Sequence, residues 1–387
     1  MDTLNDDIST LLHLFYDYID LNPTSISDPN FEENMINDIY ELLYNINEED
    51  IDDLLDFSLF IFYDTLYQQR SEDNICFQQT LLEKEKIKIK LERINNIIQP
   101  QQKTPEWYYI RQSLITASNA YKIFESNCQQ NSLIYEKCKT KTIDDFNFKQ
   151  SVNINSSLHW GQKYEPLSVL LYEDMYHTKI GDYGCIQHQT YSFIGASPDG
   201  INIDPSSNRF GRMLEIKNIV NREITGIPKK EYWIQMQFQM EVFDLQECDF
   251  LETRFIEYET EIEFFRDTND FIFLSKNGEK KGIILFFSDK KTGNPIYIYS
   301  PFFNSLQEYE EWSEKIIEKT LNDNPSFIWV KQIYWKIDEI SCVLVKRNKK
   351  WFQDVLPIIE DFWEIIQREK IEGYEHRAPK TRNKIIN

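Results

Sequence analysis

The sequence predicts an α/β protein with an added, acidic, all-helical N-terminal segment, and three observations support this. Helical and strand patterns alternate over residues 104–258 with few long loops, which is typical of an α/β core. Residues 1–75 instead show only the spacing of short amphipathic helices. A strand pattern over 333–346 and an amphipathic helix pattern over 351–369 follow near the C-terminus.

Length and composition exclude several classes of protein. The 387 residues allow two or three domains, and the 41% hydrophobic and 14% aromatic content excludes a disordered chain. There is no run of about 18 uncharged apolar residues, and the start, MDTLNDDIST, lacks the features of a signal peptide. The six cysteines form no C-x-x-C pair, which argues against zinc ribbons, iron–sulfur clusters and disulfide frameworks. We therefore expect a soluble, cytoplasmic protein with no membrane partner.

The acidic excess is concentrated in the first fifth of the chain. Residues 1–75 hold nineteen acidic residues and a single base, Arg70, so they carry −18 of the net charge of −22. Apolar residues recur at helical spacing on either side of breaks at Pro23 and Pro29. We expect a helical domain over 1–80, which is either a solvated bundle or a docking or DNA-mimicking module that covers a basic channel.

The rest of the chain divides where its composition changes. Residues 81–103 have the pattern of a basic connecting helix and linker, and 104–258 form the α/β core. Residues 259–330 are aromatic-rich and irregular, and we expect an insertion or subdomain there. The C-terminal strand and helix fall within 331–372, and the basic tail over 373–387 is expected to be mobile.

Two neighbouring segments carry the strongest chemical signal. Asp199 follows the apolar pattern YSFIGA, and Glu215 and Lys217 share one face of a strand pattern about fifteen residues later. Alone, the first segment is an ordinary Ser-Pro-Asp-Gly turn and the second an exposed strand face. A hairpin of this length brings the three side chains to one end of a sheet, where the carboxylates and a backbone carbonyl can bind Mg²⁺ or Mn²⁺. Lys217 can then hold or deprotonate a water, as in metal-dependent phosphodiester hydrolysis.

Two helices can support such a site. Glu165 falls in the first or second turn of a helix pattern that opens near Trp160, where one more carboxylate can complete a metal site. The alternative is an ordinary acidic residue at a helix start. A second helix, ending near Phe243, presents Tyr232, Gln235 and Gln239 at helical spacing. For a glutamine there, a simple surface face of the helix is the alternative.

An anion site is predicted upstream. Thr116 and Ser118 can cap the next helix and leave free N–H groups for an anion. Arg111 lies seven residues before Ser118 and can supply a bidentate contact to a phosphate. The alternative is a helix cap next to a surface arginine.

Taken in order, these motifs resemble those of the YqaJ/lambda-type exonucleases, members of the PD-(D/E)XK nuclease superfamily. Five motifs match in order over about 40% of the chain: Trp107, Arg111 and Ile115-Thr116-Ala117-Ser118; Trp160-Gly161 with Glu165; Ser197-Pro198-Asp199-Gly200; Glu215-Ile216-Lys217; and Tyr232 with Gln235 and Gln237. Many relatives have Cys-Pro after the Glu-Ile-Lys motif, where this chain has Asn218-Ile219. Relatives with added segments occur in large DNA viruses, and the Asn-, Ile- and Lys-rich composition suits such a source.

The resemblance implies a PD-(D/E)XK core, with a mixed central sheet flanked by helices and the elements of 331–372 closing it. Asp199, Glu215 and the backbone carbonyl of Ile216 would bind Mg²⁺ or Mn²⁺, with two ions in the site. Glu165 would complete the site directly or through water. Lys217 would position or activate the attacking water, and Gln235 would support the site.

The resemblance also assigns the residues that meet the substrate end. Arg111 and Ser118, helped by Thr116, would hold a 5′-phosphate. Trp107 and Tyr108 are candidates to stack on a frayed end, with core packing as the alternative for Trp107.

The implied activity is a Mg²⁺-dependent exonuclease that degrades duplex DNA 5′→3′ from phosphorylated ends, for viral recombination, repair or genome processing. The alternatives are an endonuclease or dual endo/exonuclease acting against foreign DNA, and a non-catalytic DNA-binding or regulatory protein on the same core. The implied partners are double-stranded DNA, further copies of the chain, and a single-strand annealing protein or helicase. The location would be a viral replication site in the host cytoplasm. Because the acidic charge is so concentrated in the N-terminal segment, we also expect this segment to reduce DNA binding by occupying the positive channel.

Overall fold

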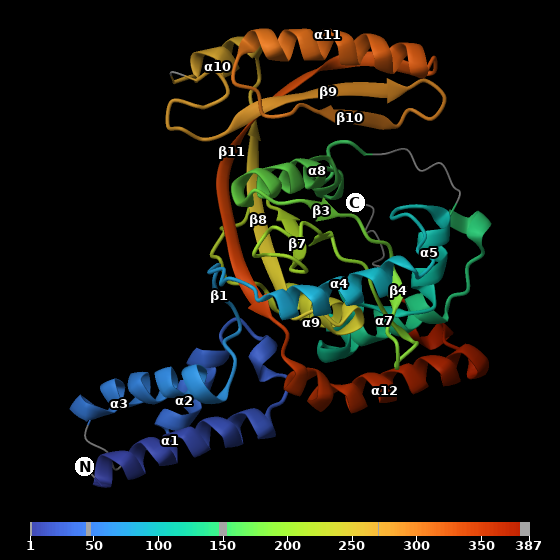
Figure 1. Cartoon of the computed structure of the whole chain (residues 1–387). Coiled ribbons are helices and arrows are strands. Elements are labelled where there is room, and N and C mark those ends of the chain that lie inside the picture. Colours follow the sequence, from blue (N-terminus) through green and yellow to red (C-terminus); the bar gives the residue numbers. More distant parts are fainter. Residues whose placement is uncertain (1, 44–47, 147–152, 270, 380–387) are drawn as a thin grey trace, which may run out of the picture.

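The computed structural model describes residues 2–43, 48–146, 153–269 and 271–379, and a long mixed sheet runs through this part of the chain (Figure 1). Within it, the sheet has eight strands, in the order β10-β9-β11-β8-β7-β6-β3, with β1 also paired to β11. Their bounds are β1 Glu72–Asp73, β3 Ile180–Gly181, β6 Gly200–Asn202, β7 Met213–Asn218, β8 Glu247–Glu257, β9 Lys281–Asp289, β10 Pro295–Tyr299 and β11 Phe327–Lys346. The predicted α/β class is therefore confirmed.

At the centre of this sheet, one helix covers each face, and a single crossover connection determines which helix covers which face. Strands β7 and β8 are parallel, and α9 (Lys230–Phe243) connects them, as a parallel pair requires. The apolar side of α9 belongs to the same buried cluster as Phe250, whereas α8 (Ser157–Tyr176) covers the other face, where Tyr172 meets Ile216. Because side chains alternate along a strand, Glu215 and Lys217 lie on the α9 face of β7.

A smaller sheet brings the upstream motifs to the core. It has the strand order β2-β5-β4, with bounds Ile115–Thr116, Ile194–Ala196 and Ile186–Gln187. The parallel pairing of β2 with β5 places the segment that contains α5 (Pro105–Gln112) and α6 (Ala117–Ala120) beside the 197–199 turn. Two 3₁₀ helices, at Tyr121–Phe124 and Ile143–Phe146, flank α7 (Asn127–Cys138).

The basic connecting helix is α4 (Leu81–Asn95), which starts with a capping box formed by Thr80 and Glu83. Several of its basic side chains bind the core: Lys84 donates to the Pro205 carbonyl (2.8 Å), Lys90 pairs with Asp244 (2.9 Å), and Arg93 donates to Gln189 (3.0 Å). The helix packs closely on Gly211, which has a φ of +79° and where a Cβ atom would lie 2.3 Å from Ile87 Cγ2.

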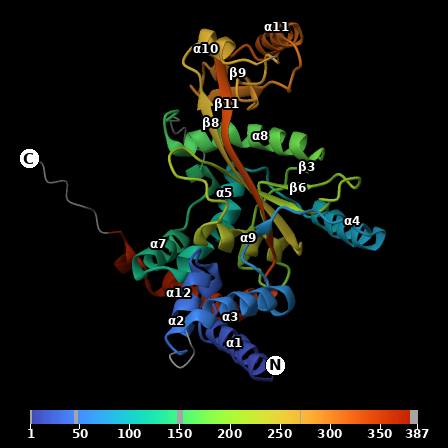
Figure 2. The same ribbon diagram turned by 90° about the vertical axis from the view of Figure 1, so that its left-hand side faces the viewer.

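The N-terminal helices are α1 (Asp2–Leu21), α2 (Phe31–Tyr40) and α3 (Glu48–Ile61), joined to a 3₁₀ turn at Ser25–Ser27 and followed by a π-helical turn at Phe62–Leu66. They lie at the end of the molecule opposite α10 (Glu261–Arg266) and α11 (Leu306–Asp323) (Figure 1, Figure 2). Their buried side chains, such as Phe15 and Phe62, form one continuous cluster with Trp233 of α9 and Phe352 of α12 (Lys349–Glu372). The acidic helices therefore share a core with the α/β region.

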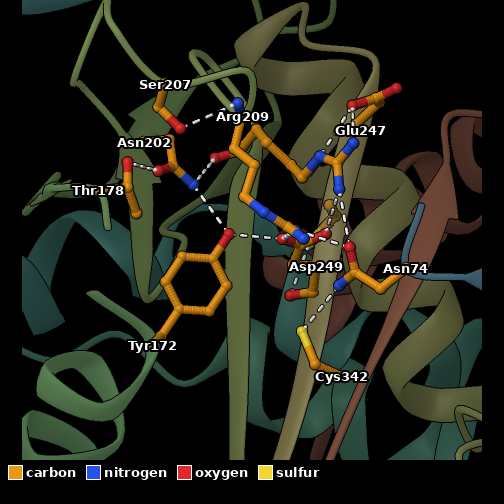
Figure 3. Close-up of polar contacts among 11 residues, drawn as sticks. Asn74, Tyr172, Thr178, Asn202, Ser207, Arg209, Glu247, Asp249 and Cys342 are labelled. Carbon is orange, nitrogen blue, oxygen red and sulfur yellow. Dashed lines mark hydrogen bonds and ion pairs between the residues drawn. The ribbon is translucent and has the colours of Figure 1, made fainter. Parts of the chain in front are cut away.

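A buried polar cluster connects the segment after the N-terminal helices, through Asn74, to the main sheet (Figure 3). The Asn74 side chain accepts from Arg209 (2.7 Å) and Arg212 (3.0 Å) and donates to Cys342 Sγ (2.9 Å). Asp249 of β8 is fully buried and accepts from both arginines. Because each charged group of this cluster has a partner, its burial is tolerated.

The 259–330 segment extends the main sheet. It contains α10 (Glu261–Arg266), strands β9 and β10, and α11 (Leu306–Asp323). Strand β11 is longer than the predicted 333–346, because residues 327–336 pair with β9 while 335–346 pair with β8. This long curved strand joins the added part to the core (Figure 1).

The described part of the C-terminal tail contradicts the prediction that it is mobile from Gly373. Glu375–Arg377 form a 3₁₀ turn, and Arg377 pairs with Glu369 of α12 and donates to Asn131 of α7. A bidentate arginine–carboxylate pair fixes this turn against the helix. The rest of the predicted tail lies outside the described residues. None of the described helices has the length and apolarity that a membrane span requires.

Candidate active site

A cavity of about 880 Å³ opens between α5, α7, the first half of α8 and the end of β7. Six of its lining side chains are basic and two are acidic, although the whole chain has a net charge of −22. The basic residues are Lys103, Arg111, Lys137, Lys139, Lys141 and Lys217, and the acidic residues are Glu136 and Glu165. The cavity thus favours a negatively charged ligand.

The Asp199 and Glu215 carboxylates lie beside the strand that forms one wall of this cavity. Asp199 sits in the turn before β6, and its Oδ2 accepts the Ile216 N–H of β7 at 2.7 Å. Glu215 is fully buried on β7. Burial and the nearby Glu215 carboxylate raise the pKa of Asp199 well above its usual value, against the opposing effect of Lys217. Two carboxylates therefore compete here for one ammonium group.

Lys217 connects the carboxylates to the cavity. Its ammonium group pairs with Glu215 Oε1 and lies 4.8 Å from the ring centroid of Tyr232. Burial acts against the charged form, but the Glu215 and Asp199 carboxylates outweigh it and raise the pKa of Lys217. Lys217 is therefore a fixed cation at this wall rather than a ready base.

Two glutamines of α9 hold Glu215 from the other side. Gln235 Nε2 donates to Glu215 Oε1, and Gln239 Nε2 donates to Oε2, both at 2.7 Å. Gln237, which matches the family motif, faces away and bonds to Lys346 and Asn348 instead. The spacing of four residues between Gln235 and Gln239 places both on one helix face, and this signal is present in the sequence.

The structure places Glu165 in the third turn of α8, because the helix begins at Ser157 rather than near Trp160. Its carboxylate pairs with Lys103 Nζ at 3.0 Å, and it is close enough to Asp199 to contribute to the raised pKa of that carboxyl. Lys103, which sequence reasoning missed, has a φ of +66° just before α5. A positive φ is uncommon for a residue other than glycine.

The donor chemistry fits a divalent cation. Asp199, Glu215 and the Ile216 carbonyl offer the hard oxygen atoms that Mg²⁺ and Mn²⁺ bind. As they stand, no three Asp, Glu, His or Cys side chains within the described ranges converge closely enough to hold an ion. The ammonium groups of Lys217 and Lys103 contact Glu215 and Glu165, so these contacts would have to give way to a cation.

The predicted anion site lies on another wall of the same cavity. Arg111 Nη2 donates to Ser118 Oγ at 2.8 Å, and Thr116 Oγ1 lies 3.4 Å from Ser118 Oγ. Burial lowers the pKa of Arg111 from its usual value. Thr116 is only 1% exposed, and its N–H donates to Asn119 Oδ1 at the start of α6. The structure thus brings Arg111 and Ser118 together, with Thr116 behind them.

The two aromatic candidates differ in what covers them. The Arg111 guanidinium lies 4.1 Å from the Trp107 ring centroid, so that face of the indole is occupied. The Tyr108 ring packs edge-on against Trp107, with centroids 4.9 Å apart, and is 41% exposed. The geometry favours the packing alternative for Trp107.

The expected masking of this channel by the acidic segment is wrong. Among the described residues that line the cavity, none belongs to 1–75. The N-terminal helices instead pack against α9 and α12, because they bury their apolar faces there. Sequence patterns show that a helix has an apolar face but not which surface that face covers.

Comparisons with known proteins give this site a family context. The model of the YqaJ-like viral recombinase domain matches residues 106–246. The uncharacterized protein R354 of Acanthamoeba polyphaga mimivirus is 31% identical over 306 residues, which cover 72% of this chain and 54% of that protein. The chain therefore spans about half the length of this curated relative, and the similarity connects it with large DNA viruses.

Two solved structures also align with the chain, at low similarity. They are LHK-Exo in complex with dAMP (TM-score 0.41, 70% of this chain and 97% of that chain) and the alkaline exonuclease LHK-Exo from Laribacter hongkongensis (TM-score 0.39, 71% and 98%), both at 18% identity. The region matched by the family model contains Arg111, Glu165, Asp199, Glu215, Lys217 and Gln235. Residues 106–246 of the chain are thus similar to the YqaJ-like viral recombinase domain.

Proposed function

We propose that this chain is a deoxyribonuclease that uses Mg²⁺ or Mn²⁺ to degrade duplex DNA 5′→3′ from phosphorylated ends. The observation that carries the proposal is the placement of the Asp199–Glu215–Lys217 cluster at one wall of a cavity lined by six basic side chains. Such a cavity attracts the phosphate backbone. The carboxylates supply oxygen donors next to it.

Each residue has a distinct task in this proposal. Asp199, Glu215 and the Ile216 carbonyl hold the metal, with Glu165 as an additional ligand once it leaves Lys103. A bound divalent cation supplies Lewis acidity and a more acidic water. Two such ions would fit the family's chemistry. Gln235 and Gln239 fix the Glu215 carboxylate, because each amide donates to one of its oxygen atoms.

Lys217 holds the attacking water and offsets the charge that builds on the reacting phosphate. The Glu215 and Asp199 carboxylates raise the pKa of Lys217, and in this proposal its protonated ammonium group acts as a hydrogen-bond donor. Arg111 and Ser118 hold the terminal phosphate and thereby set which phosphodiester bond reaches Lys217. The DNA products would be used in viral recombination or genome processing, and a single-strand annealing protein or a helicase would be the partner of the nuclease.

The test is a cleavage assay on linear duplex and closed circular DNA, with Mg²⁺ and with EDTA. We expect Mg²⁺-dependent loss of the linear duplex and an intact circle. Lys217→Ala protein from the same purification excludes a contaminating nuclease. Cleavage of the circle would indicate an endonuclease instead, and no cleavage of either substrate would favour a non-catalytic DNA-binding role.

A further inference from the structure

Lys137 is a buried lysine that neither the motifs nor the proposed mechanism uses. It lies at the end of α7 and lines the cavity, yet it is only 5% exposed. Its Nζ donates to the backbone carbonyl of Arg111 at 3.0 Å and lies 3.4 Å from Glu136 Oε1. A buried lysine is rare unless it is paired.

The charge around Lys137 is only partly balanced. Glu136 is half-exposed, and its other oxygen lies 3.8 Å from Lys122, so one carboxylate serves two lysines. In the described part of the chain, Arg111 forms no salt bridge and contacts the Ser118 hydroxyl, the Trp107 ring and the Cys185 thiol, while the Glu136 carboxylate acts on it from farther away. Burial lowers the pKa of Lys137 to about 8, although Glu136 opposes this. The site therefore holds two cations without enough negative charge.

We propose that Lys137 is a second cationic ligand of the terminal phosphate, next to Arg111, and that it determines the preference for a phosphorylated DNA end. The proposal rests on the proposed function and assigns a specificity residue within it. A terminal phosphate carries close to two negative charges. It would neutralise both cations, and Arg111 would bind it through its planar fork while Lys137 binds it as a point charge.

A DNA end with a 5′-hydroxyl brings no terminal phosphate, so the positive charges of Lys137 and Arg111 stay without a counter-charge. Binding of a hydroxyl end is therefore less favourable than binding of a phosphorylated end, because it leaves buried cations unpaired. Lys139 gives a matched comparison, since it lines the same cavity two residues away but is exposed. An exposed lysine contributes to binding of any phosphate along the backbone and does not read the end.

The experiment compares degradation rates of 5′-phosphorylated and 5′-hydroxyl duplexes by the full chain. For Lys137→Met, whose side chain fills similar space, we expect the phosphate-to-hydroxyl rate ratio to fall about tenfold or more. Lys139→Met is expected to slow both substrates and to keep the ratio. Lys137→Arg retains the charge and is expected to keep most of the preference.

A double variant separates direct contact from an effect through Arg111. If Lys137 binds the phosphate, Arg111→Gln retains part of the preference, and adding Lys137→Met removes it. An unchanged ratio in Lys137→Met, or no further loss in the double variant, would overturn the inference while the nuclease proposal stands. Failure of both Lys137 variants to fold would make the residue structural and overturn it too. Wild-type protein that degrades neither duplex would overturn the proposed function together with this inference.

Discussion

Glu215 illustrates how much of this site depends on single hydrogen bonds. A fully buried carboxylate needs several donors, and Lys217, Gln235 and Gln239 provide them. Glu215 and Lys217 could be predicted from the sequence, because alternation along a strand places residues i and i+2 on one face. Lys103 and Lys137 could not, since no local pattern predicts a lysine with positive φ or a lysine buried by packing.

The first prediction compares two glutamines of α9, Gln239 and Gln237. Gln239→Ala should lower the rate of DNA degradation by roughly tenfold or more, because it removes one of the donors that orient Glu215. Gln237→Ala is the control: its amide bonds to Lys346 and Asn348, away from the site. That variant should lower the Tm but retain activity per folded molecule. Equal losses of activity in the two variants would contradict the assignment of Gln239.

The second prediction concerns pH and Asp199. Burial and Glu215 raise the pKa of Asp199 in the folded protein, so its contribution to stability is present at low pH and is lost as pH rises through the raised pKa. Asp199→Asn cannot ionise. In EDTA, the Tm of Asp199→Asn minus that of the wild type should therefore grow between pH 5 and 9. A difference that is constant or that shrinks with pH would contradict the raised pKa.

At the scale of elements, the helices and the β7–α9–β8 crossover are predictable, because amphipathic periodicity and short connections determine them. The extent of β11 is not predictable, since its first half pairs with β9, a strand in the aromatic-rich segment whose pattern is irregular. The partner of the acidic helices is also not encoded locally. Long-range packing decides both features.

The third prediction concerns the polar cluster between β7, β8 and Asn74. Asp249→Asn should cost about 3–5 kcal/mol in the free energy of unfolding, because it leaves Arg209 and Arg212 buried with too little counter-charge. Glu247 also pairs with Arg212, but its side chain is 34% exposed. We therefore expect Glu247→Gln to lower the free energy of unfolding by about 1 kcal/mol or less. Urea denaturation measures both costs, and equal costs would contradict a special role for Asp249.

For the whole molecule, the continuous apolar cluster makes the acidic helices part of one folding unit. Phe15 and Phe62 are fully buried in the cluster that also holds Trp233. Burial of each large apolar side chain stabilises the folded state by about 1.5–3 kcal/mol, and this stabilisation is lost when the side chain is exposed. The acidic segment therefore contributes stability to the core, while its charge lies away from the cavity.

The fourth prediction concerns that charge. Neutralising Glu32, Glu33 and Asp38 together should change the Kd for duplex DNA by less than about threefold at 0.15 M salt, because charges beyond about 8 Å are largely screened. Removal of residues 1–79 should instead abolish cooperative unfolding. A much tighter complex after neutralisation, with an unchanged Tm, would revive the masking hypothesis.

The most direct test of the central claim follows one linear duplex that carries a 5′-phosphate on one strand only, with separate labels at the 5′ and 3′ ends of that strand. With Mg²⁺, the account predicts that the 5′ label is released as mononucleotide first and that the 3′ label follows after a delay that increases with duplex length. Lys217→Ala should release neither label. Earlier release of the 3′ label, or simultaneous release through internal cuts, would contradict a 5′→3′ exonuclease built on the Asp199–Glu215–Lys217 cluster and the Arg111 pocket.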